Sequence, residues 1–438
     1  MTGTTTTAKP TRLLALDVFR GLTIAGMIVV NNQVGGRPYD SLRHAGWHGW
    51  TLADLVFPSF VFIMGVALAY SMGNRARAGQ SSAKMYRHIA IRAIILFALG
   101  LLSTYDPAKG LAHIRIMGVL QRLALVYLFA SVIAMNTKSG RGLLAWAVWL
   151  SVLYWGLMKL VPVPGYGAGD LSQAGNLAAY IDNLFLKGHL YTEKWDPEGL
   201  LHTLPAISSC LLGTLTGHMI RAERKLTDKI ATIQVAGLAL IILAFIANLY
   251  FPINKNLWSP AFVMLTCGIG MCVLGAFLWV IDFRGIKSWT GPFFVLGMNP
   301  LFAYLISGLM MTALAWPSVP MPGGPCENYK AEAMCPDYQG CAWDTGRNKC
   351  VKPGVKCKLF NMEPLCKQMD DCVWNGERKK CMEVRKDTEI SLKDWLARAL
   401  FFSWGGWKKG ALFFSLAYVA LWMGITGIMY KLKIFIKI

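Results

Sequence analysis

Residues 43–54 contain two histidines, two tryptophans and a carboxylate. Histidine is the side chain best suited to proton transfer near neutral pH, and sugars stack on aromatic faces. His44, Trp47, His48 and Asp54 therefore predict a site that holds a sugar and moves a proton. An interfacial belt of aromatic residues with solvated histidines explains the same composition equally well.

Other polar residues lie within the first apolar stretch of the chain. Asp17 and Arg20 are three positions apart, so they share one face of a helix. Charged residues inside membrane spans usually pair with one another, and we expect a structural ion pair near the cytoplasmic end. Asn31 and Asn32 close the same stretch at its outer end.

The composition places these residues in a membrane protein. Of the 438 residues, 55% are hydrophobic and 16% are charged, whereas soluble domains carry roughly 25% charged residues. Mostly apolar stretches of about 18 or more residues recur, long enough to cross a hydrocarbon core of about 30 Å. The expected spans are 13–32, 52–72, 88–104, 116–135, 143–161, 200–220, 230–251, 257–281, 289–316 and 410–430. We therefore expect an all-α polytopic membrane protein of about ten transmembrane helices.

Charge distribution orients these spans. With the N-terminus in the cytoplasm, the short inner segments carry 17 Lys and Arg, against 7 in the outer loops when the long loop after the ninth span is left out. Long loops translocate largely regardless of charge. The net charge of +20 thus reflects the positive-inside rule, not a nucleic-acid surface, and both termini are expected in the cytoplasm. No cleavable signal peptide is apparent.

Eight of the eleven cysteines form an internal duplication. The spacing C-x8-C-x5-C-x8-C occurs twice, 31 residues apart, with Trp343 and Trp374 at equivalent places. Such small units bury little core, so disulfides are expected, and these persist in an oxidising compartment. A zinc module is the alternative, although CxxC pairs and a nearby His are missing. The cysteines are Cys326, Cys335, Cys341, Cys350, Cys357, Cys366, Cys372 and Cys381.

The chain is expected to fall into four regions. Residues 1–11 form a disordered tail, 12–316 a core of nine helices, 317–390 an extracytoplasmic loop with the cysteine repeats 326–350 and 357–381, and 391–438 an interfacial helix and the tenth span. The outer segments 33–51, 162–199 and 317–409 are long enough to build a site, whereas the cytoplasmic loops are short and basic. Any chemistry is therefore expected in the membrane or on its outer side.

Several blocks of the sequence are recognisable. The run Leu-Asp-Val-Phe-Arg-Gly-Leu at 16–22 is followed by Val-Asn-Asn at 30–32 and by His-Ala-x-Trp-x-Gly-x-Thr-x-Ala-Asp-Leu-Val-Phe-Pro at 44–58. Further blocks are Gly-Val-Leu-Gln-Arg at 118–122, Asp-Pro-Glu-Gly-Leu at 196–200 and Asn-Pro-Leu at 299–301. Together they resemble the heparan-α-glucosaminide N-acetyltransferase family, which comprises the lysosomal enzyme and its bacterial relatives. The cysteine repeats are no part of that pattern and resemble an insertion.

The resemblance implies acetyl transfer across a membrane. Family members take acetyl-CoA from the cytoplasm and acetylate the amine of a terminal glucosamine on the lumenal or outer side, without a metal. The family's essential histidine corresponds to His44, which would act as a general base or as an acetylated intermediate. The position of His48 is Asn in the lysosomal enzyme. The residues expected to bind the acceptor are Asn31, Asn32, Trp47, His48, Asp54, Asp196, Glu198 and Asn299.

The donor would need cations or helix N-termini for its phosphates. Arg20, Arg92, Gln121 and Arg122 are the candidates, although Arg20 and Arg92 are explained equally well as positive-inside charge. An arginine at position 122 is expected to face the bundle interior or a water-filled cavity. No glycine loop of the soluble acetyltransferase type is present, so CoA is expected in a channel between helices. The resemblance also suggests a homodimer in a bacterial inner membrane or a lysosomal membrane.

Two other functions remain open from the sequence. Ten spans with intramembrane charges would also suit a transporter for hexosamines or related sugars, although no inverted repeat is evident. Alternatively, the cysteine repeats are a binding domain on a membrane scaffold. Eight cysteines allow 105 pairings, and the duplication favours pairings within each repeat.

Overall fold

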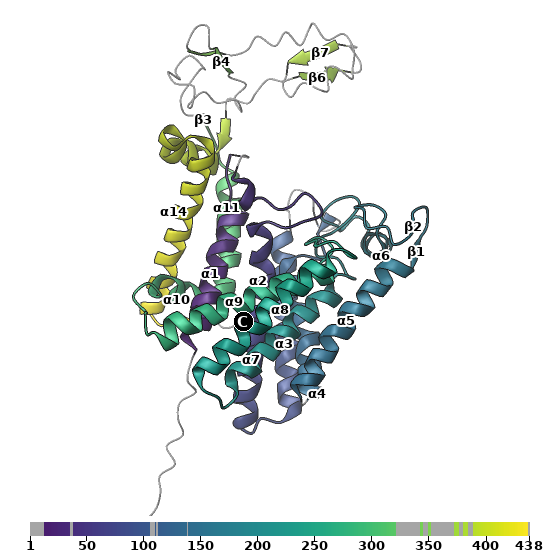
Figure 1. Cartoon of the computed structure of the whole chain (residues 1–438). Helices are drawn as coiled ribbons and strands as arrows, with labels where there is room; N and C mark the ends of the chain where they lie inside the picture. The colour runs from purple at the N-terminus through teal and green to yellow at the C-terminus, as the bar shows by residue number, and fades with distance from the viewer. Residues whose placement is uncertain are drawn as a thin grey trace, which may run out of the picture. The chain divides into compact units, whose positions relative to one another are not determined.

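The computed structural model describes residues 13–35, 38–105, 110, 113–137, 139–320, 342–344, 349–351, 372–375, 380–383 and 389–436 (Figure 1). The chain divides into two compact units. The first consists of Met1–Val30, Asp40–Ser307 and Val419–Ile438, and the second of Asn31–Tyr39 and Gly308–Tyr418. The predicted disordered tail, 1–11, lies outside the described residues.

Long helices dominate the first unit. They are α1 (Leu14–Asn31), α2 (Leu52–Arg77), α3 (Ser82–Thr104), α4 (Val119–Asn136), α5 (Gly140–Leu160), α7 (Thr203–Arg221), α8 (Leu226–Ala247), α9 (Pro260–Phe277) with the π-helix η3 (Leu278–Phe283), α10 (Gly291–Met298), α11 (Pro300–Ala315) and α14 (Ser403–Lys431). Three of these, α1, α11 and α14, continue into the second unit. Side-chain oxygens of Ser81, Ser139 and Ser259 accept backbone N–H groups at the starts of α3, α5 and α9, which explains where these helices begin.

Eight helices in the described part of the chain are long and apolar enough to cross a membrane. They are α1 to α5, α8, α9 with η3, and α14. The ninth predicted span, 289–316, is a bent pair of helices, α10 and α11, which meet at 86° and together are long and apolar enough to form one broken span. The break falls at Asn299-Pro300, where proline disfavours a helical conformation of the preceding residue; Asn299 has φ −126° and ψ 54°.

The sixth predicted span corresponds to α7, which is not among these eight. Most of its residues are buried against protein. The loop before α2 touches the loop before α9, since the Gly49 N–H donates to the Ile253 carbonyl at 2.8 Å. Two loops can share one side of a membrane only when an even number of crossings separates them. Counting α2, α3, α4, α5, α7 and α8 gives six, which favours α7 as a crossing helix.

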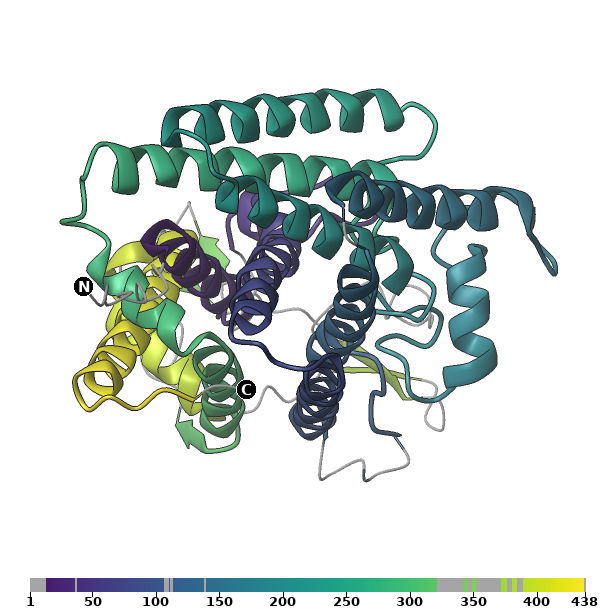
Figure 2. The ribbon, with the colours of Figure 1, turned by 90° about the horizontal axis from the view of Figure 1, so that it is seen from below.

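Glycines let α2 and α7 pack closely against each other along much of their length. A Cβ on Gly65 would lie 2.0 Å from the Cys210 carbonyl oxygen, and one on Gly213 would lie 2.1 Å from the Phe62 carbonyl oxygen. Small residues let membrane helices approach closely. A second long pair, α8 and α9, runs side by side along one edge of the bundle (Figure 2). Helix α2 is thereby held against α7, and it also contacts α9.

Short elements cover the predicted outer ends of these helices. The strands β1 (Pro162–Val163) and β2 (Gly167–Ala168) pair antiparallel, and α6 (Leu177–Leu186) follows them. Tyr154, Met158 and Phe251 form a buried cluster with α6 and the loop before α9. The remaining single turn in this region is η1 (Asp40–Leu42).

The second unit contains the duplicated segment. Strand β4 (Ala342–Asp344) pairs with β5 (Lys349–Val351), and β6 (Cys372–Asn375) pairs with β7 (Lys380–Glu383). Trp343 lies opposite Cys350, and Trp374 lies opposite Cys381, so the backbone repeats with the spacing of the sequence. Strands β3 (Ser318–Pro320) and β8 (Glu389–Ser391) pair antiparallel on either side of the cysteine-rich segment in the sequence. Helix α13 (Leu392–Ala397) with η8 (Arg398–Phe402) forms the predicted helical segment before the last span. The predicted disulfides rest on side chains outside the described ones.

Candidate active site

A carboxylate saturated with hydrogen bonds stands at the start of α2. Asp54 Oδ2 accepts from the backbone N–H groups of Ala45 (3.0 Å) and Thr51 (3.1 Å), whereas the Thr51 hydroxyl donates to the Arg43 carbonyl at 2.6 Å. Asp54 Oδ1 lies 2.7 Å from His44 Nδ1. Because an ionised carboxylate can only accept, Nδ1 carries the proton and Nε2 of the neutral ring is left basic. The Asp54 side chain is 1% exposed and that of His44 47% exposed, so the pair is a buried anchor beneath an accessible base.

A lysine from a distant loop completes this pair. Lys255 Nζ lies 3.0 Å from His44 Nδ1, 3.2 Å from His44 Nε2 and 3.5 Å from Asp54 Oδ1. Burial lowers the pKa of Lys255, although the charges of Asp54 and Glu198 act to raise it. The site therefore combines a base, a carboxylate and a largely buried ammonium group.

The loop that carries Lys255 is held by His48. Asn254 Oδ1 accepts the Leu257 N–H at 2.9 Å, which leaves Asn254 Nδ2 as the donor to His48 Nδ1 at 3.2 Å. Burial lowers the pKa of His48, in keeping with a neutral ring that accepts at Nδ1. His48 therefore helps to hold the 248–259 loop in place, and it contacts this loop and not His44.

Trp47 joins the histidine segment to the outer segment 162–199. Its indole N–H donates to the Leu171 carbonyl at 2.8 Å, and its ring packs edge-to-face on Trp195 at 5.1 Å. Directly after Trp195, Asp196 binds Arg115 through both carboxylate oxygens at 2.9 and 2.6 Å, and Glu198 binds the same guanidinium at 2.5 Å. The structure thus gives Asp196 and Glu198 a partner that the sequence did not suggest. Burial alone would lower the pKa of Arg115, but these two carboxylates raise it.

Arg122 and Gln121 are neighbours in α4, and both are fully buried. Arg122 donates through Nη2 to the Gly199 carbonyl at 3.2 Å and its guanidinium lies 5.1 Å from the Trp258 ring centroid. Both amide atoms of Gln121 are buried without a hydrogen-bond partner among the described residues. Gln121 fills the space beside Gly100, where a Cβ would lie 2.4 Å from its Oε1. Neither residue is among those lining the basic cavity described next.

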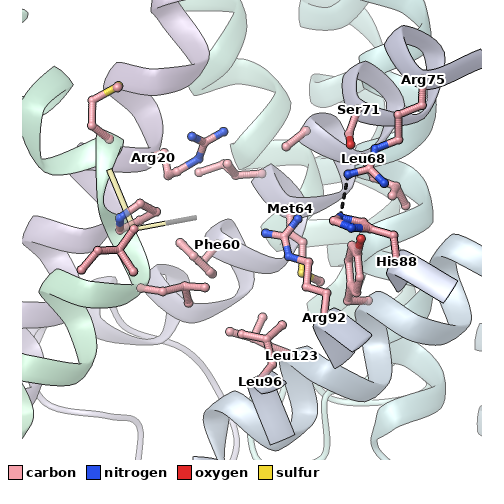
Figure 3. A pocket seen from close by; sticks show the side chains of 17 residues that line it. Arg20, Phe60, Met64, Leu68, Ser71, Arg75, His88, Arg92, Leu96 and Leu123 are labelled. Carbon is pink, nitrogen blue, oxygen red and sulfur yellow. Dashed lines mark hydrogen bonds between the residues drawn. The ribbon is translucent and has the colours of Figure 1, made fainter. Parts of the chain in front are cut away.

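A basic cavity of about 400 Å³ lies farther along α2 (Figure 3). At 1.5 Å per helical residue, its wall begins at Phe60, about 9 Å from Asp54, and ends at Arg75, about 31 Å away. Arg20, Arg75, His88 and Arg92 line it, and no carboxylate does among the described lining residues (Figure 3). The complete lining is Arg20, Phe60, Ile63, Met64, Ala67, Leu68, Ser71, Arg75, His88, Arg92, Leu96, Leu123, Tyr127, Met298, Pro300, Leu301 and Ile436.

The arginines that line this cavity make some contacts with neighbouring side chains. Arg20 Nη1 lies 3.2 Å from Asp17 Oδ1, which confirms the predicted pair. Arg75 Nη2 donates to His88 Nε2 at 2.6 Å (Figure 3). Arg92 lies 4.9 Å from the Tyr127 ring centroid, and its Nε is buried without a hydrogen-bond partner among the described residues. A surplus of positive charge with an unsatisfied donor suits an anionic ligand.

The three asparagines predicted to bind the acceptor fall into two groups, Asn299 in the first unit and Asn31 and Asn32 in the second. Asn299 Oδ1 accepts the Ile436 N–H at 2.8 Å and its Nδ2 donates to the Ile434 carbonyl at 3.1 Å. Since Ile436 and both neighbours of Asn299 line the basic cavity, Asn299 lies beside that cavity. Asn31 and Asn32 belong to the second unit, where Asn31 is exposed and Asn32 is buried.

Comparison with known proteins decides the family. A family model described as heparan-alpha-glucosaminide N-acetyltransferase, catalytic, matches residues 12–253. The chain belongs to this family. It is 34% identical over 355 residues to heparan-alpha-glucosaminide N-acetyltransferase of Homo sapiens, covering 68% of this chain and 53% of that protein. The corresponding enzyme of Mus musculus is 33% identical over 351 residues, covering 67% and 53%. The chain thus spans about half the length of the curated relatives it matches.

The candidate site includes residues that the sequence analysis did not single out. Lys255 lies just beyond the matched residues, in an Asn-Lys-Asn stretch between two apolar runs. Polar residues at the outer end of a predicted span were the available signal. Arg115 was hidden among ordinary outer-loop charges, and Arg75 and His88 among positive-inside charges. Only the contacts of the folded chain distinguish these residues from solvated ones.

Proposed function

We propose that this protein is a membrane acetyltransferase that moves the acetyl group of cytoplasmic acetyl-CoA to the amine of a glucosamine-type sugar on the outer or lumenal side. The observation that carries the proposal is the His44–Asp54 pair at one end of α2, with a basic cavity farther along the same helix. Family membership supports the acetyl-transfer chemistry.

The His44–Asp54 pair supplies the base. An amine that attacks a thioester must lose a proton, and a neutral imidazole within hydrogen-bond reach accepts it. With Nδ1 bonded to Asp54, Nε2 is the atom that takes the proton. The same Nε2 would be the nucleophile if His44 were acetylated first and then passed the group on. Both routes need the same tautomer, so the structure supports the assignment of His44 under either.

The basic cavity supplies the donor site. Phosphates of CoA need cations, and Arg20, Arg75, His88 and Arg92 face one space (Figure 3). The wall of the cavity approaches Asp54 to within about two helical turns, so a donor that enters at the Arg75 end would carry its acyl group toward His44. Gln121 and Arg122 fit this role less well, because they do not line the cavity.

The sidedness of the reaction rests on charge and topology. Arg75 and His88 belong to the predicted cytoplasmic end of α2 and α3, whereas His44, Trp195 and Lys255 lie on loops predicted outside. The donor would therefore bind from the cytoplasm and the acceptor from the opposite side. The family relationship supports glucosamine as the acceptor class, and in a bacterium the enzyme would lie in the inner membrane.

The test is a proteoliposome assay with acetyl-CoA and glucosamine on opposite sides of the membrane. We expect N-acetylglucosamine to form on the glucosamine side without net flux of the free sugar. The His44→Ala variant should lose activity by at least about 10²-fold, whereas His48→Ala, which disturbs only the bond to Asn254, should lose much less. Sugar flux without acetylation would favour a hexosamine transporter, and full activity of His44→Ala would refute the assigned base.

A further inference from the structure

Lys255 occupies a position that a merely structural lysine does not need. Its side chain is 14% exposed and reaches from the loop before α9 to the base at the start of α2. The loop is fixed on both sides of Lys255, because Ile253 accepts from the Gly49 N–H at 2.8 Å and Asn254 accepts from the Leu257 N–H at 2.9 Å. The ammonium group is therefore held at a defined place beside His44.

The distances define where that place is. Nζ lies 3.0 and 3.2 Å from the two ring nitrogens of His44. A group in the plane of the ring at these two distances would collide with the Cε1 atom between the nitrogens. The ammonium group must therefore lie over the face of the imidazole. The hydrogen bond in the ring plane at Nδ1 already goes to Asp54, so the face is the remaining approach.

This placement leaves donors available for substrate. An ammonium group has three N–H donors, and Asp54 Oδ1 at 3.5 Å occupies the direction of one. The carbonyl of a thioester attacked by an amine that is bonded to Nε2 comes within a few ångströms of Nε2, and Nζ lies 3.2 Å from that atom. Donors aimed at the place where negative charge develops stabilise acyl-transfer transition states strongly.

We propose that Lys255 is a catalytic residue of the acetyl transfer and donates a hydrogen bond to the oxyanion of the tetrahedral intermediate. The inference rests on the proposed function. The amine nitrogen attacks the thioester carbonyl carbon, and the carbonyl π electrons move onto oxygen, where Lys255 stabilises them. His44 Nε2 takes one proton from the nitrogen. When the oxyanion reforms the carbonyl, the carbon–sulfur bond breaks and the CoA thiolate takes up that proton.

A buried cation that only balanced Asp54 would behave differently. It would stabilise the fold and the ground state, and its loss would affect thermal stability more than the rate. An oxyanion donor acts only when the oxygen becomes negative, so its loss lowers kcat and leaves ground-state binding unchanged. Burial lowers the pKa of Lys255 because its ammonium is poorly hydrated, and a poorly hydrated donor interacts strongly with a new negative charge.

The experiment compares Lys255→Met, Lys255→Gln and Lys255→Arg in the purified full chain, with Lys187→Met as the matched control. Lys187 is an exposed lysine that follows α6 in another outer loop. We expect Lys255→Met to lower kcat by about 10²–10³-fold, the range seen for loss of one oxyanion donor. The KM values for acetyl-CoA and glucosamine should change less than about threefold, and Lys255→Arg should restore part of kcat.

A second measurement separates catalysis from structure. The methylphosphonothioate ester of CoA carries an anionic tetrahedral centre where acetyl-CoA carries its planar carbonyl. Lys255→Met should weaken binding of this analogue by about the factor lost in kcat/KM, and leave binding of CoA itself unchanged. Equal loss of analogue and CoA binding would overturn the proposal, as would wild-type kcat in a folded Lys255→Met. If Lys255→Met gives no folded protein, the same comparison is made with Lys255→Gln, which keeps a polar side chain without the charge. A Lys255 variant with wild-type kcat beside an inactive His44→Ala refutes only the role of Lys255, whereas an active His44→Ala refutes the proposed function.

Discussion

Replacement of Asp54 by asparagine tests the proposed base most directly, because the surrounding contacts dictate how the new amide must lie. Two backbone N–H groups, of Ala45 and Thr51, donate to Oδ2. An NH2 group there would face these two N–H groups, so the asparagine must place its oxygen at Oδ2. Its NH2 group then takes the place of Oδ1, facing His44 and Lys255.

That orientation reverses the hydrogen bond to the base. At 2.7 Å, the new NH2 group can only donate, so His44 must accept at Nδ1 and carry its proton on Nε2. The nitrogen that should take the proton from the amine is then blocked. The equivalent change in serine proteases keeps the geometry and lowers kcat by about 10⁴-fold through this same wrong tautomer. We expect a loss of kcat of about 10³–10⁴-fold, with the overall fold retained.

The assay is steady-state acetylation of glucosamine by purified protein, with thermal unfolding of each variant as the measure of folding. Asp40→Asn, an exposed carboxylate in the same outer segment, is the control and should keep wild-type kcat. An Asp54→Asn variant that is folded and within about tenfold of wild-type kcat would refute the assignment of Nε2 as the proton acceptor. A variant that loses activity only through a lower folded fraction would make Asp54 a structural residue.

Three further substitutions test the remaining parts of the site. Arg92→Met should raise the KM for acetyl-CoA by about tenfold or more, since a charge-assisted hydrogen bond contributes about 1.5–3 kcal/mol, and exposed Arg87→Met should not; equal KM values would remove Arg92 from the donor site. Asp17→Asn should lower protein yield more than turnover per folded molecule, because a lost partner of a shielded pair costs about 3–5 kcal/mol; normal yield with a raised KM for acetyl-CoA would instead assign Arg20 to the donor. Burial raises the pKa of Asp182 to about 7, so its contribution to stability is present below its ordinary pKa and is lost as pH rises through about 7. Asp182→Asn should therefore stabilise the protein by about 3 kcal/mol more at pH 8 than at pH 5, and an equal change in melting temperature at both pH values would contradict the buried, proton-binding carboxyl.

The family resemblance singled out His44 as the proposed base, whereas the sequence did not indicate which distant residues would surround it. His44 and Asp54 lie ten positions apart on either side of a helix start, and the capping role of Asp54 toward Thr51 brings them together locally. Lys255 reaches them from a loop more than two hundred positions away. Nothing in an Asn-Lys-Asn stretch indicates which of many outer loops it will touch, because that depends on how α2, α7 and α9 pack.

The same limit explains how the predicted cation group divides. Arg20, Arg92 and Arg122 were grouped because each is a charge within or beside a span. In the structure Arg20 and Arg92 line the basic cavity, and Arg122 lies at the other end with Gly199 and Trp258. The depth of a residue in the membrane follows from its position in the helix and the direction of the span. The sequence therefore allowed one to predict that Arg122 lies at a different depth from Arg20 and Arg92. The direction in which each guanidinium points was not.

The break at Asn299 shows how a local signal acquires a functional meaning only in the fold. Asn-Pro within an apolar stretch predicts an interruption, and the structure realises it as an 86° bend between α10 and α11. At this bend the Asn299 side chain does not bond to its own helices. It binds the backbone of the C-terminal segment at Ile434 and Ile436. Met298 and Pro300 at the bend and Ile436 at the C-terminal end therefore line the same cavity. A residue expected to bind the acceptor is thus placed to shape the wall of the proposed donor site.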